Sequence, residues 1–355
     1  MFDLYSGNTP SRLNKEHFKG TVNWISSGEL KEHYIYSSKE QISEEAAKSL
    51  KLLPVGTFVI AIYGLEADGV RGTGSITQEP STISQACMSF IPKGVIENEF
   101  LYSWYKKHGN VIGIRYAQGT KQQNLSYDIL EKFRIAYPNT KEQEKLNKFI
   151  SLLDERIATQ NKIIEDLKKL KSAISKKLLC NDKWTTCIIQ DIAEIGRGRV
   201  ISSVEIDRQK HPLYPVYSSQ TSNNGIMGYL DNYMFDGEYI TWTTDGANAG
   251  TVFYRKGKFN CTNVCGTLKI LPKFDCYFVS LVLQQATQKY VSSNLANPKL
   301  MNNTMASIKI RMPNIETQKQ LSKVFKTLDS CLLVHQRTCK MYLSEKQYLL
   351  RQMFI

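Results

Sequence analysis

The sequence predicts an α+β protein in which two strand-rich α/β units in tandem alternate with two long helices. Three observations lead to this prediction: a length of 355 residues, which suits two domains, an internal repeat, and two long segments without Pro or Gly. The expected boundaries are residues 1–137 for the first unit, 138–183 for the first helix, 184–312 for the second unit and 313–355 for the second helix.

Both helices are predicted from their entry signals and from their lack of helix breakers. They cover about residues 141–179 and 316–353. Each follows a Pro-Asn pair, which ends the preceding strand and supplies an Asn that can cap the first turn. The two segments align without a gap at an offset of 175 residues, from Pro138 to Pro313.

Apolar residues along both helices are spaced alternately by four and three positions, as in a coiled coil. The seam of the first helix comprises Leu146, Ile150, Leu153, Ile157, Gln160, Ile164, Leu167, Lys171, Ile174 and Leu178. The seam of the second comprises Leu321, Phe325, Leu328, Leu332, His335, Cys339, Tyr342, Lys346, Leu349 and Met353. Polar residues interrupt both seams at matching places, and such residues commonly fix the register of paired helices.

The segments before the two helices match each other in the same order. Residues 25–28 correspond to 217–220, 54–62 to 235–243, 84–87 to 262–265, and 121–126 to 299–304. The second unit opens with residues 184–192, WTTCIIQDI, which have no counterpart in the first. The first unit is therefore expected to lack its opening strand or to borrow one.

The net charge of +13, from 46 Lys and Arg against 33 Asp and Glu, favours a polyanionic partner. Residues 1–137 have 15 basic and 14 acidic side chains, so the excess lies mostly outside the first unit, and neither unit is strongly basic. No run of 18 apolar residues predicts a membrane span, and the N-terminus lacks the layout of a signal peptide. We therefore expect a cytoplasmic protein without membrane contact.

Polar loop residues at matching places in the two units are candidate DNA contacts. Asn and Gln can pair with adenine, and Arg and Lys with guanine or phosphate. In the first unit the candidates are Ser26, Ser27, Arg71, Lys121, Gln122, Gln123 and Asn124. In the second they are Arg197, Arg199, Ser218, Ser219, Gln220, Asn223, Asn224, Thr244, Asn248, Lys299, Asn302 and Asn303.

No motif predicts catalysis or a metal site in this chain. There is no G-x-x-x-x-G-K-[ST] loop, and no glycine motif for S-adenosylmethionine follows a strand. The eight cysteines include no zinc-site spacing, so they are expected to be reduced structural thiols. The five histidines share no motif with a nucleophile or an acid. The chain is predicted to be non-catalytic and to bind no cofactor itself.

The tandem organisation resembles that of the specificity (S) subunits of Type I restriction–modification enzymes. The resemblance covers essentially the whole chain and rests on the two helix entries, FRIAYPNTKEQEKL (133–146) and IKIRMPNIETQKQL (308–321). The Leu-Asp pairs at 153–154 and 328–329, Trp184, the PVYSSQ run at 215–220 and Gly-Thr-Lys at 119–121 also fit. The missing opening of the first unit departs from the pattern.

The resemblance implies that each globular unit is a target recognition domain that reads one half of a split DNA sequence. It also implies that the two long helices pack antiparallel and set the gap between the half-sites. The expected partners are double-stranded DNA, two adenine-N6 methyltransferase subunits and the restriction (endonuclease/translocase) subunits. S-adenosylmethionine would then be bound by the methyltransferase subunits, which flip the adenine.

Two other readings of the sequence are open. One is a tandem coiled-coil adaptor that binds protein rather than DNA and lacks salt-dependent DNA binding. The other is an enzyme with an unrecognised site, which methylation by the purified chain alone would reveal.

Overall fold

The computed structural model describes residues 1–64, 73–116, 123–179, 182–292 and 297–354. The chain divides into unit 1, residues 1–161 and 337–355, and unit 2, residues 162–336. Each unit thus contains one globular part and one half of each long helix. The division cuts across both helices and does not fall at their ends.

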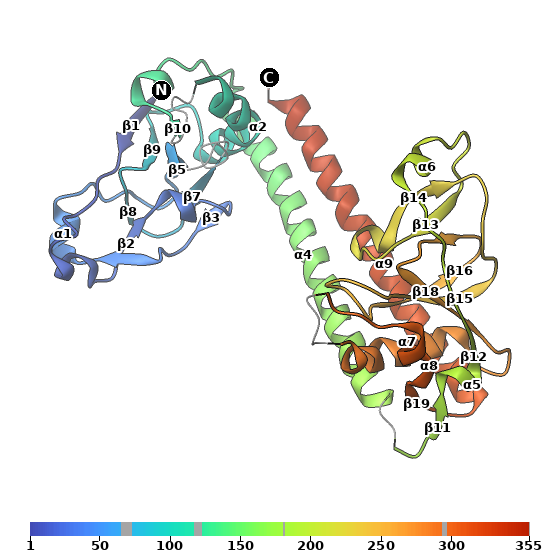
Figure 1. The fold of residues 1–355 in the computed structure, drawn as a ribbon. Coiled ribbons are helices and arrows are strands. Elements are labelled where there is room, and N and C mark those ends of the chain that lie inside the picture. The colour runs from blue at the N-terminus through green and yellow to red at the C-terminus, as the bar shows by residue number, and fades with distance from the viewer. Residues whose placement is uncertain (65–72, 117–122, 180–181, 293–296, 355) are drawn as a thin grey trace. The chain divides into compact units, whose positions relative to one another are not determined.

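Unit 1 contains two main sheets (Figure 1). The larger has the order β1-β9-β5-β7-β3, with β1 Phe2–Ser6, β9 Cys87–Pro92, β5 Phe58–Ala61, β7 Gly74–Thr77 and β3 Tyr34–Ile35. The smaller has the order β4-β2-β8, with β4 Glu40–Ile42, β2 Val22–Ile25 and β8 Ser81–Ile83. Strands β10 Gln123–Asn124 and β6 Tyr63–Gly64 form a separate two-stranded sheet. The unit also contains helices α1 Glu44–Lys48, α2 Asn98–Tyr116 and α3 Tyr127–Leu130.

Unit 2 repeats this plan. Its larger sheet has the order β12-β18-β15-β16, with β12 Ala193–Arg197, β18 Cys265–Ile270, β15 Glu238–Thr243 and β16 Val252–Lys256. Its second sheet has the order β14-β13-β17, with β14 Ile226–Leu230, β13 Tyr214–Tyr217 and β17 Asn260–Cys261. The helices are α5 Ile189–Ile192, α6 Ser203–Asp207, α7 Cys276–Ala286 and α8 Asn302–Ser307, and β11 Thr185–Ile188 pairs with β19 Lys309–Met312.

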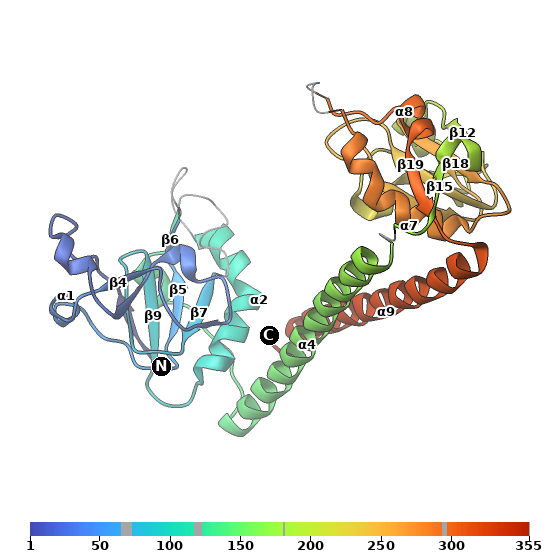
Figure 2. The ribbon, with the colours of Figure 1, turned by 90° about the horizontal axis from the view of Figure 1, so that it is seen from below.

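The predicted α+β class is confirmed in both units. One helix packs on one face of each larger sheet, α2 in unit 1 and α7 in unit 2 (Figure 2). Both cores lie at this helix–sheet interface, where Phe58 and Phe100 in unit 1 and Trp242 and Phe278 in unit 2 are fully buried. Phe58 and Trp242 belong to strands β5 and β15, whose alternating pattern places them on the face that the helix covers, and Phe100 and Phe278 come from the helices themselves.

Strand register shows which residues of the two units are equivalent. Phe58 lies opposite Phe90 in unit 1, and Ile240 lies opposite Leu268 in unit 2. Four residues further on, the carbonyl of Ile62 accepts the N–H of Leu125, and that of Thr244 accepts the N–H of Leu300. Leu125 is therefore the equivalent of Leu300, and Asn124 is the equivalent of Lys299.

This register corrects the sequence alignment of residues 121–126 with 299–304 by three residues. It also corrects the alignment of 54–62 with 235–243 by one residue along the strand, because Ile62 is the equivalent of Thr244. The offset of 175 that holds along the helices already begins at Leu125 and Leu300. The alignment at 121–126 was wrong because it matched two lysines across loops of unequal length, whereas the backbone hydrogen bond is made by the buried leucines.

The long helices α4 Thr140–Leu178 and α9 Ile315–Met353 run antiparallel within each unit. In unit 1 the ammonium of Lys346 contacts Asp154 at 2.5 Å, and Cys339 contacts Asn161. In unit 2 Lys171 pairs with Asp329. The lysines that interrupt the seams are thus each neutralised by the Asp of a Leu-Asp pair on the facing helix. Seam residues are buried or half-buried except Leu178, which is 37% exposed.

A buried glutamine joins each globular part to the helix that follows it. The side-chain oxygen of Gln143 accepts the N–H of Glu97 at 2.9 Å, and its NH₂ group donates to the carbonyls of Val95 and Pro138. Because α2 begins at Asn98, this glutamine satisfies a backbone donor at that helix's N-terminus. The Pro-x-x-x-x-Gln pattern at the start of the long helix is therefore explained by the hydrogen bond from the glutamine side chain to the proline carbonyl.

Unit 2 builds the same junction. Gln318 accepts the N–H of Asp275, the N-cap residue of α7, at 2.9 Å and donates to the carbonyl of Pro313 at 2.8 Å. Gln143 and Gln318 are 0% and 1% exposed. Water therefore cannot replace either side chain without a rearrangement of the junction.

We expect Gln143→Ala to destabilise unit 1 by about 2–4 kcal/mol, because it removes the three hydrogen bonds that this fully buried side chain makes to backbone groups. Gln318→Ala should act in the same way on unit 2. Urea unfolding followed by circular dichroism measures both effects. The matched control is Gln320→Ala, which removes an exposed glutamine from the same helix and should change stability by less than about 0.5 kcal/mol. Equal losses for Gln318→Ala and Gln320→Ala would contradict the role of the junction.

Candidate nucleic-acid interface

One end of the larger sheet of unit 2 gathers charged and amide side chains from three parts of the chain. Arg197 ends β12, Asp245 follows β15, and Lys299 and Asn302 lie just before and at the start of α8. β12 and β15 are both antiparallel to β18, so their C-terminal ends lie at the same edge. We call Arg197, Asp245, Lys299 and Asn302 the unit 2 edge cluster.

Arg197, like the other three members of the edge cluster, is half-buried. One terminal nitrogen of its guanidinium lies 3.4 Å from the Asn302 side-chain oxygen. Its Nε is buried and has no hydrogen-bond partner among the residues that the structure describes.

Lys299 and Asp245 lie opposite each other at this edge. Their backbones form a β-bridge, and the ammonium lies 3.7 Å from the carboxylate. The Thr244 hydroxyl donates to the same Asp245 carboxylate at 2.6 Å and is fully buried. Thr244 was predicted as a DNA contact, but its position is structural: it orients Asp245 and is inaccessible to a base. Asn248 and Asn303 are exposed near the same edge.

The loop between β13 and β14 presents a second polar group in unit 2. Ser218, Ser219 and Gln220 are half-buried, and the Gln220 side chain donates to the carbonyl of Ile226. Asn223 and Asn224 are exposed and have φ angles of 48° and 54°. Asn adopts the left-handed region more readily than most residues, and here two in succession form the exposed turn of the loop.

Arg199 is held by an internal partner. Both of its terminal nitrogens contact the carboxylate of Glu205, the first at 2.9 Å. This hydrogen-bonded guanidinium lowers the pKa of the Glu205 carboxyl. Arg199 is therefore less available than Arg197, because any phosphate contact must compete with a two-pronged ion pair.

The candidate DNA contacts of unit 1 are placed less favourably for binding DNA than those of unit 2. Ser26 donates both its hydroxyl and its backbone N–H to Glu29, so its polar groups are already satisfied. Ser27 is half-buried beside it, and Asn124 is exposed at the end of β10. Arg71, Lys121 and Gln122 lie outside the described residues, and for Gln123 only the backbone in β10 is described.

The sequence prediction missed two side chains that shape the unit 2 surface. Asp245 follows a strand and precedes a glycine. This sequence indicated a turn, but it did not indicate that Asp245 pairs with Lys299. Arg255 is 4% exposed, donates to the Thr241 hydroxyl at 3.1 Å and stacks on Tyr217 at 3.6 Å. It thus supports the strand that leads into the polar loop. A lone arginine inside a strand gave no signal of this role.

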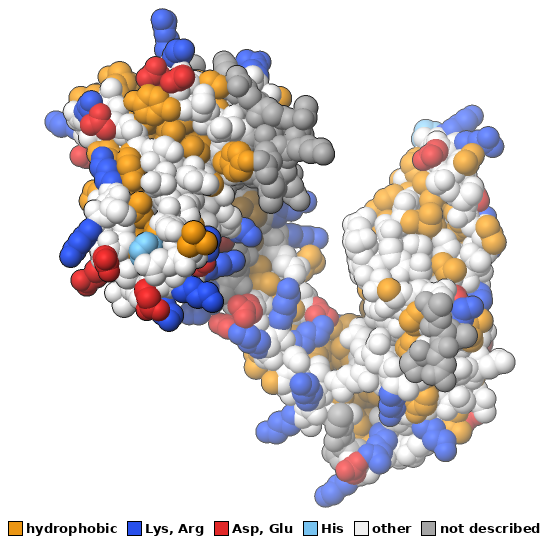
Figure 3. Space-filling model, turned by 60° about the vertical axis from the view of Figure 1, so that its left-hand side comes forward, with side chains coloured by type: hydrophobic (Ala, Val, Ile, Leu, Met, Phe, Trp, Pro, Cys, Tyr) orange, Lys and Arg blue, Asp and Glu red, His pale blue; other side chains and the backbone are white. Residues whose placement is uncertain are grey.

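Charge alone does not locate the interface. On the face shown in Figure 3, Lys and Arg side chains are scattered over both units among uncharged side chains. Within the described ranges, no group of three His, Cys, Asp or Glu side chains could hold a metal ion. Of the described helices, none combines the length and the apolar character that crossing a membrane requires.

The fold and its polar edges define a tandem-repeat protein whose two halves share one architecture and differ in their loops. A family model described as the "Type I restriction modification DNA specificity domain" matches residues 1–169 and again 181–340. The chain therefore belongs to the family of Type I restriction–modification specificity subunits, as the sequence resemblance predicted.

Individual relatives agree with this assignment. The chain is 38% identical over 193 residues to the "Putative type I specificity subunit S.MpnORF201P" of Mycoplasma pneumoniae, which covers 54% of this chain and 80% of that protein. It is 42% identical over 145 residues to the type I restriction enzyme MpnII specificity subunit of the same organism, covering 41% and 43%.

The S subunit of M. genitalium has the same fold. Its crystal structure matches with a TM-score of 0.69 at 17% identity and covers 100% of this chain and 94% of that one.

Proposed function

We propose that this chain reads a two-part DNA sequence, with one globular part for each half-site. The observation that carries the proposal is the equivalence of the two units: four strands of the larger sheet in the same order and the same glutamine junction present different side chains at the same sheet edge. A common backbone with different edge residues is what the recognition of two unequal half-sites requires.

The two edges differ in chemistry. Arg197, Asp245, Lys299 and Asn302 in unit 2 correspond by register to Ser6, Tyr63, Asn124 and Tyr127 in unit 1. Tyr63 and Tyr127 are 38% and 45% exposed. Unit 2 therefore offers charged donors suited to guanine or phosphate, whereas unit 1 offers hydroxyl, amide and aromatic groups. The half-sites are expected to differ accordingly.

The long helices are proposed to set the distance between the half-sites. Each has 39 residues without interruption and is therefore about 58 Å long. The ion pairs of Lys346 with Asp154 and Lys171 with Asp329 fix the antiparallel register in the two units separately. A fixed register gives a fixed length, as a spacer needs.

The proposed partners are two adenine-N6 methyltransferase subunits and the restriction subunits. The MpnII relative is named as part of a type I restriction enzyme, and a chain from work on complex assembly in the type I R-M system matches with a TM-score of 0.58. In this proposal the chain positions DNA in the cytoplasm and catalyses nothing. S-adenosylmethionine is bound by the methyltransferase subunits.

The adaptor hypothesis makes the opposite prediction for DNA. A protein-binding adaptor would show no salt-dependent affinity for a duplex, whereas a reader that neutralises phosphates loses affinity steeply as salt rises. A salt titration of the full chain with duplex DNA therefore separates the two functions.

Arg197→Ala should weaken binding about ten-fold to a duplex that contains the methylated motif of cells expressing this system. Fluorescence anisotropy of the full chain measures the affinity, and methylation mapping should show relaxed sequence choice in one half of the motif only. The matched control is Lys256→Ala, which removes one positive charge from the opposite end of the same sheet. Equal effects of the two substitutions would contradict the proposed edge.

Insertion of one heptad into both long helices should lengthen the gap between half-sites by about 10 Å, or about three base pairs, and leave the half-site sequences unchanged. The insertions belong after Asn161 in α4 and before Cys339 in α9, because these residues face each other and the ion pairs on both sides then persist. Methylation mapping reads the motif. A changed half-site sequence with an unchanged gap would show that the helices are not the spacer.

A further inference from the structure

Arg255 of β16 is a buried cation in unit 2. It is 4% exposed, its Nε donates to the Thr241 hydroxyl at 3.1 Å, and its guanidinium stacks on the Tyr217 ring at 3.6 Å. Within the part of the chain that the structure describes, it forms no ion pair with Asp or Glu. The acidic groups that act on its charge include the thiols of Cys261 and Cys265. Because a buried charge is costly without compensating partners, these two thiols belong to its environment.

The two thiols lie at the ends of one tight turn. Cys261 ends β17 and Cys265 begins β18, and the N–H of Cys265 donates to the carbonyl of Thr262 at 3.0 Å to close the turn. The two cysteine side chains also hydrogen-bond to each other. They are 0% and 3% exposed, directly beneath the exposed Asn263. Sulfur atoms in contact at the ends of a turn meet the main geometric requirement for a disulfide.

The two thiols differ in acidity. The hydrogen bond from the Cys261 thiol lowers the pKa of Cys265, although burial opposes this effect. The guanidinium of Arg255 and the hydroxyl of Thr241 also favour the charged form of this sulfur. The same hydrogen bond, together with burial, raises the pKa of Cys261. A sulfur that carries negative charge beside a protonated thiol is the arrangement of a reactive cysteine with a resolving partner.

Unit 1 builds the same turn without the second thiol. Register makes Cys87 the equivalent of Cys265, and it makes Ile83 the equivalent of Cys261. Ile83 packs in an apolar core cluster, and the Cys87 sulfur lies 3.6 Å from the Ser84 hydroxyl. Burial raises the pKa of Cys87 to about 12. Cys87 is therefore an unreactive structural thiol, and unit 1 lacks the dithiol of unit 2.

We propose that Cys261 and Cys265 are an oxidation site that forms a reversible disulfide when the protein meets a peroxide. The Cys265 sulfur attacks one peroxide oxygen, the O–O bond breaks, and one water leaves, which gives a sulfenic acid. The Cys261 sulfur then displaces the sulfenic oxygen as a second water. Two thiols thus lose two hydrogen atoms, and one peroxide is reduced to two waters. The inference does not depend on DNA recognition.

The place of this bond in the fold suits a redox-responsive site. β17 belongs to the sheet β14-β13-β17 and β18 to the larger sheet, so the disulfide would join the two sheets of unit 2. Tyr217, on which Arg255 stacks, pairs with Cys261 and ends the strand that leads into the polar loop. Disulfides in a reducing compartment are mostly transient and redox-sensing, so a thiol reductant is expected to reverse this one.

The test treats the reduced full chain with hydrogen peroxide, blocks the remaining thiols by alkylation in denaturant, and analyses tryptic peptides by mass spectrometry. One tryptic peptide, FNCTNVCGTLK (259–269), contains both cysteines and no other. It should lose the mass of two hydrogen atoms and escape alkylation, and dithiothreitol should restore both thiols. Cys87 is the internal control, because it is buried in the equivalent turn, and it should be recovered in its alkylated form.

A matched pair of substitutions tests how Cys265 is activated. Thr241→Val should slow disulfide formation several-fold, because it removes a hydrogen bond that favours the charged sulfur. Val59 occupies the equivalent position of unit 1, so the fold accepts this side chain. Thr243→Val is the control and should leave the rate unchanged, since that buried hydroxyl has no hydrogen-bond partner among the described residues. Circular dichroism checks that both variants fold.

A third variant, Cys261→Ser, removes the resolving thiol with little change in volume. Peroxide should then leave Cys265 as a sulfenic acid, which a dimedone probe labels, whereas the unmodified chain should show little labelling there. The proposal is wrong if both cysteines of peptide 259–269 remain open to alkylation after peroxide treatment, or if Cys87 is oxidised as readily. Equal rates for Thr241→Val and Thr243→Val would overturn the proposed activation of Cys265.

Discussion

The rest of the structure depends on the buried glutamine that joins each globular part to its long helix. Gln143 and Gln318 each satisfy the first backbone donor of the core helix and a carbonyl at the turn into the long helix. Both glutamine side chains are buried, so the direction in which each long helix leaves its sheet is set by hydrogen-bond geometry. Farther along the helices, the Lys–Asp ion pairs fix how the two helices are aligned, since each ammonium meets its carboxylate in only one register.

A shared backbone plan with different edges suits one architecture to the two recognition tasks proposed above. The core strands of both units have the same order, and large apolar side chains fill both helix–sheet interfaces. Substitutions at the strand ends cost little stability, because those side chains lie outside the core. The edges can therefore differ, with charged and amide groups in unit 2 and tyrosines in unit 1, while the long helices stay alike.

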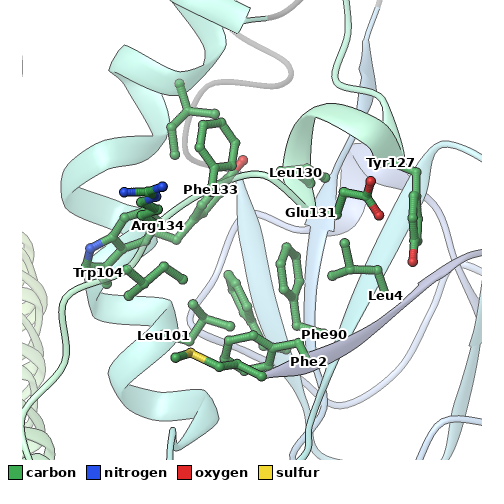
Figure 4. A pocket seen from close by; sticks show the side chains of 15 residues that line it. Phe2, Leu4, Phe90, Leu101, Trp104, Tyr127, Leu130, Glu131, Phe133 and Arg134 are labelled. Atoms are coloured by element: carbon green, nitrogen blue, oxygen red, sulfur yellow. The ribbon is translucent and has the colours of Figure 1, made fainter.

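The two units differ in how the chain closes their cores. Unit 2 closes its core with Ile189, Ile192 and the β11 strand. At the place of β19, residues 134–137 of unit 1 form neither strand nor helix, and a pocket of about 500 Å³ with a mixed polar and apolar lining lies beside the larger sheet (Figure 4).

The sequence by itself determined the tandem organisation, the helix bounds to within about two residues, the heptad seams and the family, because periodicity and entry signals are local properties of the chain. Only the tertiary structure decided the accessibility of individual polar residues. Thr244 is buried beneath Asp245, Arg199 is engaged by Glu205, and Lys299 aligns with Asn124 and not with Lys121. These outcomes depend on neighbours distant in sequence, and hydrogen bonds between such neighbours leave no periodic pattern to read.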